Sequence, residues 1–317
     1  MNIMRTTITA LAIALMPLSM AAQKVKQLTI LHTNDTHSCI LPEKKNLADT
    51  TLAGRGGFAR RVAVLNEERK KDPDLLYFDS GDFSQGSAFY TMFKGDVEVG
   101  LMNKMGIAAS TIGNHEFDFG VENLARLADN ANFPILCSNY DFTGTALEGK
   151  IKPYIIIKRK GLKIGVFALD PELEGLVSAK TCKGVKFLDP RVKAKEMSEF
   201  LKKKKKCDLV ILVSHLGWGD RKYEDPSIIA NSRYIDLVLG GHSHSNFQTL
   251  KYAKNLDGKE IPVDQILPKA TSSPSSTRAH RRATSRRRSI RPLSTRPLQV
   301  WHRSAPSRAT SCISAAR

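Results

Sequence analysis

The chain has 317 residues, which is enough for one large or two ordinary domains with a sizeable buried core. Its formal net charge of +18 would suit a nucleic-acid-binding protein, but residues 271–317 contain 11 arginines and no lysine or acidic residue. Subtracting those 11 charges leaves +7 for the preceding 270 residues, in which Lys202–Lys206 supplies five lysines. A lysine run at the end of a helix is typical of a solvated face. The body is therefore only mildly basic, and this argues against a nucleic-acid-binding domain.

The amino end has the layout of a secretory signal peptide. Arg5 is followed by the apolar run Ile8–Met16, by Pro17 and by small residues that end at Ala21 and Ala22. This pattern predicts cleavage after one of these two alanines. The apolar run is shorter than the ~20 residues that span a bilayer, and no cysteine at the cleavage point offers a lipid attachment site. We expect residues 1–22 to be removed and the protein to be periplasmic or secreted, without a membrane anchor.

The cysteines do not form a metal-binding or redox motif. There are five, none in Cys-x-x-Cys spacing: Cys39, Cys137, Cys182, Cys207 and Cys312. Export permits a disulfide among the first four, although no pairing can be deduced from their spacing. Isolated buried thiols are an equally good interpretation.

The first predicted strand ends in a group of polar residues. Gln27–Thr33 alternates as a strand does and leads into Asn34-Asp35-Thr36-His37. The spacing Asp-x-His places two side chains on the same side of an extended backbone, which suits a shared cation. A polar turn is the alternative. Apolar residues then recur at helical spacing from Phe58 to Lys70.

A second and a third strand end in the same way. Leu75–Phe78 leads into Asp79-Ser80-Gly81-Asp82-Phe83, where Gly81 allows a sharp turn that brings Asp82 close to whatever lies above the strand. Capping of the turn by the two aspartates is the alternative. Val97–Met105 reads as a helix, and the short strand Ala108–Ile112 follows. That strand leads into the stretch Gly113-Asn114-His115-Glu116-Phe117-Asp118, which precedes an amphipathic helix over Val121–Ala131.

The second half repeats the pattern. It contains a strand over Ile135–Ser138, a predicted hairpin of Tyr154–Ile157 and Lys163–Leu169, and a helix over Arg191–Lys206. Two near-continuous apolar runs follow, as in strands that are covered on both faces: Leu209–Val213 and Ile235–Leu239. The first ends in Ser214-His215-Leu216-Gly217 and the second in Gly240-Gly241-His242-Ser243-His244.

The positions of the histidines indicate one shared site. Strands that alternate with helices predict a layered α/β core, and the binding site of such a core lies beyond the carboxyl ends of the strands. Of the six histidines before residue 271, only His32 lies within a predicted strand, and we interpret it as structural. The other five follow strand ends: His37, His115, His215, His242 and His244.

Seven nitrogen and oxygen donors exceed the needs of one tetrahedral zinc ion. They suit two adjacent divalent ions that share one carboxylate. Ligation by imidazole and carboxylate without thiolate favours zinc or manganese, with iron or cobalt as alternatives. Two such ions ~3.5–4 Å apart can hold a hydroxide nucleophile and the oxygens of a phosphate ester. His115 is then left to donate a proton to the leaving oxygen, oriented by Asp118. The seven donors are Asp35, His37, Asp82, Asn114, His215, His242 and His244.

These motifs, taken in order, resemble the metallophosphatase domain of exported bacterial 5'-nucleotidases, which are calcineurin-like phosphoesterases. The resemblance runs from about Leu28 to about Gln265 and implies a four-layer α/β/β/α sandwich around a dinuclear centre. It implies that Asp82 is the shared ligand, and that His115 and Asp118 form the catalytic dyad. The resemblance also divides the remaining ligands: Asp35, His37 and His244 for one ion, Asn114, His215 and His242 for the other.

The carboxyl-terminal part departs from this family. Its nucleotidases continue into a second domain that holds the nucleoside, and nothing here resembles that domain. The family's domain also closes with a strand after the segment that matches Asn255–Pro262, whereas here the sequence becomes rich in Ser, Arg, Thr, Pro and Ala after Gln265. We therefore expect a metallophosphoesterase domain over 23–265 without its closing strand, and a disordered tail over 266–317. A reading-frame shift near Gln265 explains the change in composition better than a basic arm that binds nucleic acid or a cell surface.

The predicted function is hydrolysis of small phosphate esters, nucleotides first among them, by a metal-activated hydroxide with His115 as general acid. A phosphodiesterase acting on cyclic nucleotides or nucleotide-sugars would use the same centre. The alternative from another class is a non-catalytic module that binds metal or nucleotide and needs a separate nucleotide-binding partner chain. A nucleic-acid binder rests on the arginine-rich tail alone, so we expect no specific nucleic acid.

Overall fold

The computed structural model describes residues 25–46, 54, 56–247, 249–266, 275–282 and 299–303. The predicted signal peptide lies outside the described residues. Among the helices of the described ranges, none is both long enough and apolar enough to cross a membrane. Within the described ranges, Cys137 and Cys207 are buried free thiols and Cys182 is a partly buried one.

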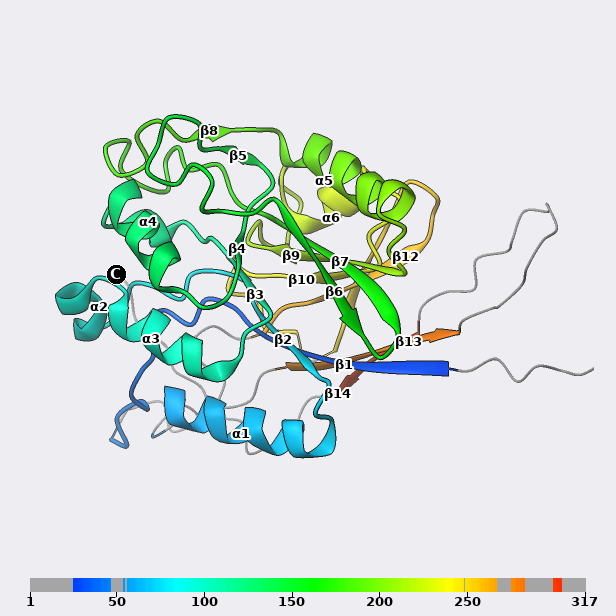
Figure 1. The fold of residues 1–317 in the computed structure, drawn as a ribbon, viewed down its shortest axis with the longest axis horizontal. Coiled ribbons are helices and arrows are strands. Elements are labelled where there is room, and N and C mark those ends of the chain that lie inside the picture. Colours follow the sequence, from blue (N-terminus) through cyan, green and yellow to red (C-terminus); the bar gives the residue numbers. More distant parts are fainter. Residues whose placement is uncertain are drawn as a thin grey trace, which may run out of the picture.

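Two six-stranded sheets form the centre of the molecule (Figure 1). The first has the order β14-β13-β1-β2-β3-β4, in which the neighbours from β1 to β4 run parallel. Its strands are β1 (Val25–Thr33), β2 (Leu76–Asp79), β3 (Ala109–Thr111), β4 (Ile135–Leu136), β13 (Ser275–Arg282) and β14 (Gln299–Arg303). The second has the order β11-β12-β10-β9-β7-β6, with antiparallel pairing only of its two edge strands. Its strands are β6 (Tyr154–Arg159), β7 (Leu162–Leu169), β9 (Leu209–Ser214), β10 (Leu237–Leu239), β11 (Lys251–Lys254) and β12 (Glu260–Asp264).

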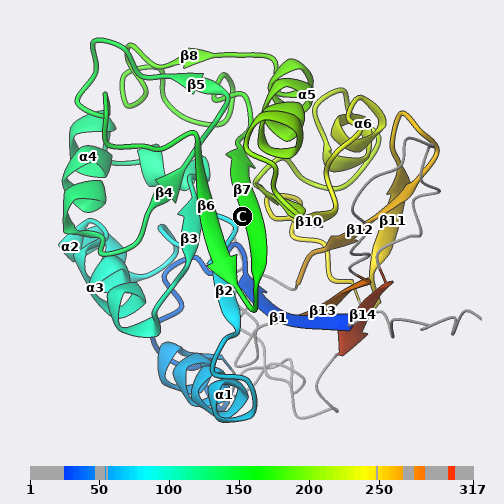
Figure 2. The same ribbon diagram turned by 45° about the vertical axis from the view of Figure 1, so that its right-hand side comes forward.

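Helices cover the outer face of each sheet (Figure 2). The first sheet carries α1 (Phe58–Lys71), α2 (Ala88–Phe93), α3 (Asp96–Met105) and α4 (Val121–Asn130). The second carries α5 (Pro190–Glu199), the π turn η2 (Phe200–Lys204) and α6 (Asp225–Ala230), and a two-stranded ribbon joins β5 (Tyr140–Asp141) to β8 (Lys186–Phe187).

The core lies in three layers, as a four-layer sandwich requires. Ile30 and Phe78 of the first sheet pack between the sheets against Val166 and Ile211 of the second. One further cluster lies under α1, α3 and α4, and another under α5 and α6. Each Å² of apolar surface that is buried stabilises the folded state by ~25 cal/mol. These layers therefore dominate the stability of the fold. The predicted α/β/β/α sandwich is confirmed.

Most predicted elements are present with small changes at their ends. The amphipathic pattern after Asp118 forms α4, and the two apolar runs form β9 and β10, both buried along their whole length. The helix predicted over 191–206 ends at Glu199 and widens into the π turn. The short helix α2 was not predicted, because its six residues do not span two turns of apolar periodicity.

The carboxyl-terminal segment differs from its prediction in two stretches. Strand β13 pairs antiparallel with β1 over eight residue pairs, from Val25 opposite Arg282 to His32 opposite Ser275, and β14 pairs with β13. Here the structure has strands in two parts of the segment that the sequence predicted to be disordered, whereas the missing closing strand stays a prediction. On the side away from β2, the edge of β1 presents a row of backbone donors and acceptors, and an extended segment such as β13 can pair with them. The domain limits and the frame shift stay predictions.

Candidate metal centre

Backbone hydrogen bonds hold the loops that follow β1 and β2 side by side. The amide of Asp35 donates to Gly81 O over 2.9 Å, and that of His37 donates to Asp82 O over 2.9 Å. Because β1 and β2 are parallel neighbours, their carboxyl ends open at the same edge of the sheet. Asp79 stays below this edge as a turn cap, since its carboxylate accepts from the Gly81 amide over 3.1 Å.

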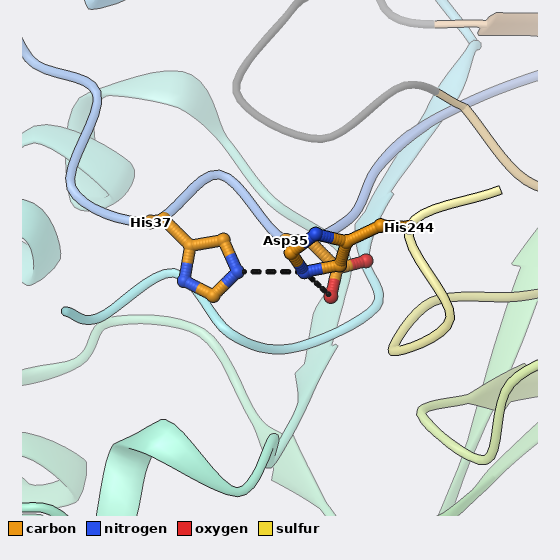
Figure 3. Close-up of side chains that lie close together, drawn as sticks. All are labelled: Asp35, His37 and His244. Atoms are coloured by element: carbon orange, nitrogen blue, oxygen red, sulfur yellow. Dashed lines mark hydrogen bonds and ion pairs between the residues drawn. The ribbon is translucent and has the colours of Figure 1, made fainter. Parts of the chain in front are cut away.

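Asp35, His37 and His244 form a first ligand cluster, drawn in Figure 3. The Nε2 atom of His244 lies 3.0 Å from Nε2 of His37 and 3.4 Å from Oδ1 of Asp35. The first two residues are buried, whereas the side chain of His244 is 51% exposed. Burial raises the pKa of Asp35, but the neighbouring His244 and His215 outweigh it, so that the net pKa is lowered. A carboxylate and two imidazole nitrogens thus converge on one point.

Asp82, His215 and His242 form a second cluster beside the first. Oδ2 of Asp82 lies 3.1 Å from Nε2 of His215 and 4.0 Å from Nε2 of His37, so this carboxylate stands between the two clusters. Nδ1 of His215 lies 2.6 Å from the carbonyl oxygen of Ser80. A hydrogen bond to that carbonyl places the proton on Nδ1 and leaves Nε2 as a lone-pair donor for a metal ion. Burial opposes the negative charge of Asp82, but His215 and His37 hold its pKa well below the usual range.

Asn114 lies on the loop after β3, and its Oδ1 atom is buried without a hydrogen-bond partner. An unsatisfied buried carbonyl oxygen costs ~1–3 kcal/mol, and ligation of a cation would remove that cost. The adjacent amide of His115 donates to Oδ1 of Asp82 over 2.9 Å, which places the Asn114 loop against the second cluster.

His115 and Asp118 meet on the short 3₁₀ turn η1 (His115–Phe117) and the residue after it. Nδ1 of His115 lies 3.1 Å from Oδ2 of Asp118, and both side chains are 30% exposed. The imidazole also stands edge-on to His37, with 5.4 Å between the ring centroids. Partial burial lowers the pKa of His115, but Asp118 and Asp82 raise it by more, so the net shift favours the protonated ring. A cavity of about 410 Å³ opens beside this pair, with Asp118, Phe119 and Tyr90 in its wall.

Glu116 is part of the site, although sequence reasoning gave it no role. Its buried carboxylate accepts backbone N–H groups from Asp82 (3.0 Å), Ser84 (3.0 Å) and Gly113 (2.5 Å). It therefore ties the loop after β2 to the loop after β3. Burial and the charge of Asp82 raise the pKa of Glu116 to about 8. The N–H groups that its two oxygens accept act in the opposite direction, because hydrogen bonds to a carboxylate stabilise its ionised form and lower its pKa. Its place inside the Asn-His-Glu stretch was the only sequence signal for it.

Most of the candidate ligands have an unusual backbone conformation. Left-handed φ values are rare and costly for residues other than glycine, at ~1–3 kcal/mol each, and such strain concentrates at functional sites. Five of the seven candidate ligands have them: Asp35 (47°), His37 (41°), Asp82 (52°), His242 (67°) and His244 (52°).

The structure thus brings together the histidine and carboxylate site residues that the sequence singled out, and it places the loop that carries Asn114 beside them. Two neighbouring groups of nitrogen and oxygen atoms contain no thiolate, and the Asp82 carboxylate of the second lies 4.0 Å from His37 of the first. The buried carbonyl oxygen of Asn114 beside them is unsatisfied. This donor set fits a pair of divalent ions such as zinc or manganese. Which residue binds which ion stays a proposal.

Comparison with known proteins identifies the family. Residues 28–246 match the family described as calcineurin-like phosphoesterase. The chain is 34% identical over 227 residues to the NAD 5'-nucleotidase of Haemophilus influenzae, covering 70% of this chain and 37% of that protein. It is 33% identical over 237 residues to the 5'-nucleotidase of Vibrio cholerae, covering 70% and 41%.

A solved structure agrees with these matches. The 5'-nucleotidase precursor of Thermus thermophilus superposes with a TM-score of 0.70 at 28% identity, over 80% of this chain and 51% of that one. The chain spans about two fifths of the length of the two relatives it matches in sequence. It belongs to the calcineurin-like phosphoesterases, and bacterial 5'-nucleotidases are among its relatives.

Proposed function

We propose that this chain is a metal-dependent phosphoester hydrolase of the 5'-nucleotidase type, acting on nucleotides or similar phosphomonoesters. The observation that carries the proposal is the position of Asp82, whose carboxylate lies between two ligand clusters and near the His115–Asp118 pair. The similarity to 5'-nucleotidases over two thirds of the chain supports the nucleotide as substrate. The signal-like amino end supports a periplasmic or secreted location.

The ligand assignment follows the two clusters. Asp35, His37 and His244 would hold one ion and Asn114, His215 and His242 the other, with Asp82 shared. When bound, two divalent ions lower the pKa of a water molecule and offset the negative charge of the phosphate.

The remaining chemistry is proton transfer by His115. Its Nδ1 atom is held by Asp118, which leaves Nε2 free to carry a proton toward the leaving oxygen. Because Asp118 also lines the 410 Å³ cavity, the alcohol part of the ester can extend into that space as it departs. General acids in such positions contribute ~10²–10⁴-fold to the rate.

The test is hydrolysis by the purified full chain loaded with Mn²⁺ or Zn²⁺. We expect release of phosphate from p-nitrophenyl phosphate and from nucleoside 5'-monophosphates, lost on chelation and in His215→Ala. Asp189→Asn is the matched control, because this carboxylate caps α5 at the Arg191 amide (2.8 Å), pairs with the Arg191 guanidinium and contacts no candidate ligand. Full activity in His215→Ala would contradict the proposal.

The same panel separates the alternatives. Turnover of bis-p-nitrophenyl phosphate or a cyclic nucleotide, without turnover of monoesters, would favour a phosphodiesterase. Binding of two metal ions without turnover of any ester would favour a non-catalytic module, which would need a separate nucleotide-binding partner chain.

A further inference from the structure

We propose that Gln265 is a positioning residue for the metal centre. The segment after β12 would hold the loop that carries Asp35 and the loop that carries His244 in fixed positions relative to each other. This inference rests on the proposed metal site and concerns a residue outside it. The side chain of Gln265 is fully buried. It directly follows Asp264, the last residue of the strand that borders β10.

Gln265 contacts the histidine loop at three points. Its Nε2 donates to Gly241 O over 2.7 Å, and its Oε1 accepts from Ser243 Oγ over 3.0 Å. Its backbone oxygen accepts from the Phe247 amide over 3.0 Å. The amide side chain is thus satisfied at both ends by the residues that flank His242.

The loop needs such contacts because its backbone is strained. His242 and His244 have φ values of 67° and 52°, in the left-handed region. Residues other than glycine keep such values only where the surrounding structure over-determines them. Ser243 lies between these two histidines, so its bond to Gln265 acts at the centre of the strained turn.

The next residue reaches the other half of the site. The backbone of Ile266 donates to Asn34 Oδ1 over 3.1 Å and accepts from Asn34 Nδ2 over 3.0 Å. The same Nδ2 donates to Oδ2 of Asp35 over 2.5 Å. Two consecutive residues therefore connect the loop that carries Asp35, from the first sheet, to the loop that carries His244, from the second. Figure 3 shows these two ligands reaching each other from separate loops.

The chain offers a matched control in Asn255, another buried side-chain amide. Its Nδ2 donates to Arg233 O over 3.0 Å, and its Oδ1 accepts from the amides of Asp257 (2.9 Å) and Lys259 (3.0 Å). Two of these contacts lie in the turn between β11 and β12, the third joins that turn to the segment before β10, and none involves a candidate ligand. Asn255→Ala removes a comparable set of hydrogen bonds and should lower stability without affecting the metal centre.

The experiment measures Mn²⁺ binding by the full chain, by titration against a competing chelator, together with the melting temperature of the metal-free protein. We expect Gln265→Ala to bind Mn²⁺ about 10–100-fold more weakly than the wild type, the loss that is typical when a residue that orients metal ligands is removed. Asn255→Ala should keep the wild-type Mn²⁺ affinity, even where its melting temperature falls as far.

A gentler variant covers the case in which Gln265→Ala does not fold. Ser243→Ala removes one hydroxyl, which also accepts from the Trp218 amide, and should weaken Mn²⁺ binding by a smaller factor in the same direction. Wild-type affinity in Ser243→Ala and Gln265→Ala, or an equal loss in Asn255→Ala, would overturn the proposal. Because the readout is metal binding, a protein that binds Mn²⁺ but hydrolyses no ester would contradict the proposed function and leave this test intact.

Discussion

At the scale of single residues, the contact between His115 and Asp118 predicts a defined pH dependence. Asp118 raises the pKa of His115, so that the ring stays protonated to higher pH than it would alone. A general acid must be protonated, and activity should therefore fall as pH rises through that pKa. In Asp118→Asn the pKa of His115 should be lower, and the basic limb of the pH profile should move to lower pH.

The measurement for this pair is kcat/KM against pH for both proteins at the same Mn²⁺ concentration. Both enzymes carry the same ions, so the effect of the metal charge on His115 cancels in the comparison. A basic limb at the same pH in Asp118→Asn would show that His115 is not the acid of the reaction. Asp189→Asn should leave the profile unchanged.

Glu116 gives a second prediction at this scale. Its carboxylate accepts three backbone N–H groups, and the amide of Glu116→Gln would turn a donor toward at least one of them. We expect the free energy of unfolding to fall by ~1–3 kcal/mol, the cost of leaving a buried donor unpaired. Urea denaturation measures this loss. Glu148→Gln is the control, because that exposed carboxylate accepts a single N–H, from Gly144 (2.8 Å), and should change stability little.

At the scale of elements, the turn after β2 depends on a glycine that packs against two other ligand loops. Gly81 has a φ of +84°, and a Cβ there would lie 2.8 Å from the amide nitrogen of Gly113 and 2.9 Å from Nδ1 of His215. Gly81→Ala should therefore destabilise the fold by more than the ~1–3 kcal/mol of backbone strain alone, and should weaken metal binding. Gly258 has a similar φ of +74°, but a Cβ there would have no atom within 4 Å. Gly258→Ala should therefore cost only the backbone strain energy and leave the metal affinity unchanged. Equal effects of the two substitutions on Mn²⁺ binding would contradict this view of the turn.

The sequence predicted which strands deliver site residues, because apolar runs such as Leu209–Val213 have a clear boundary where polar residues begin. Parallel pairing of β1, β2 and β3 then brings their ends together without further information. The left-handed backbone at Asp35 and His37 could not be predicted, since neither residue type requires it. Nor could the role of Gln265, because its side chain acts on a loop that precedes it by some twenty residues and carries no motif of its own.

At the scale of the whole molecule, the candidate centre lies where the two sheets meet. Asp35 and Asp82 come from loops of the first sheet, and His215, His242 and His244 from loops of the second. Bound ions would thus join two layers whose other contacts are mainly apolar side chains. A ligand that binds only the folded state stabilises it by RT ln(1 + [L]/Kd), which is ~2.7 kcal/mol for one site at a free metal concentration 100 times Kd.

We therefore expect the melting temperature of the full chain to fall when a chelator removes the ions and to rise again as Mn²⁺ is added. The rise should be smaller in His215→Ala, because His215 belongs to the second cluster and lies 3.1 Å from the Asp82 carboxylate. Differential scanning calorimetry at several Mn²⁺ concentrations measures both effects. Gly258→Ala should show the wild-type rise from a lower starting temperature, since its strain lies in a turn away from the ligands. A melting temperature that does not depend on metal would mean that these side chains hold no ion in the folded state, and the proposed hydrolase would lose its catalytic centre.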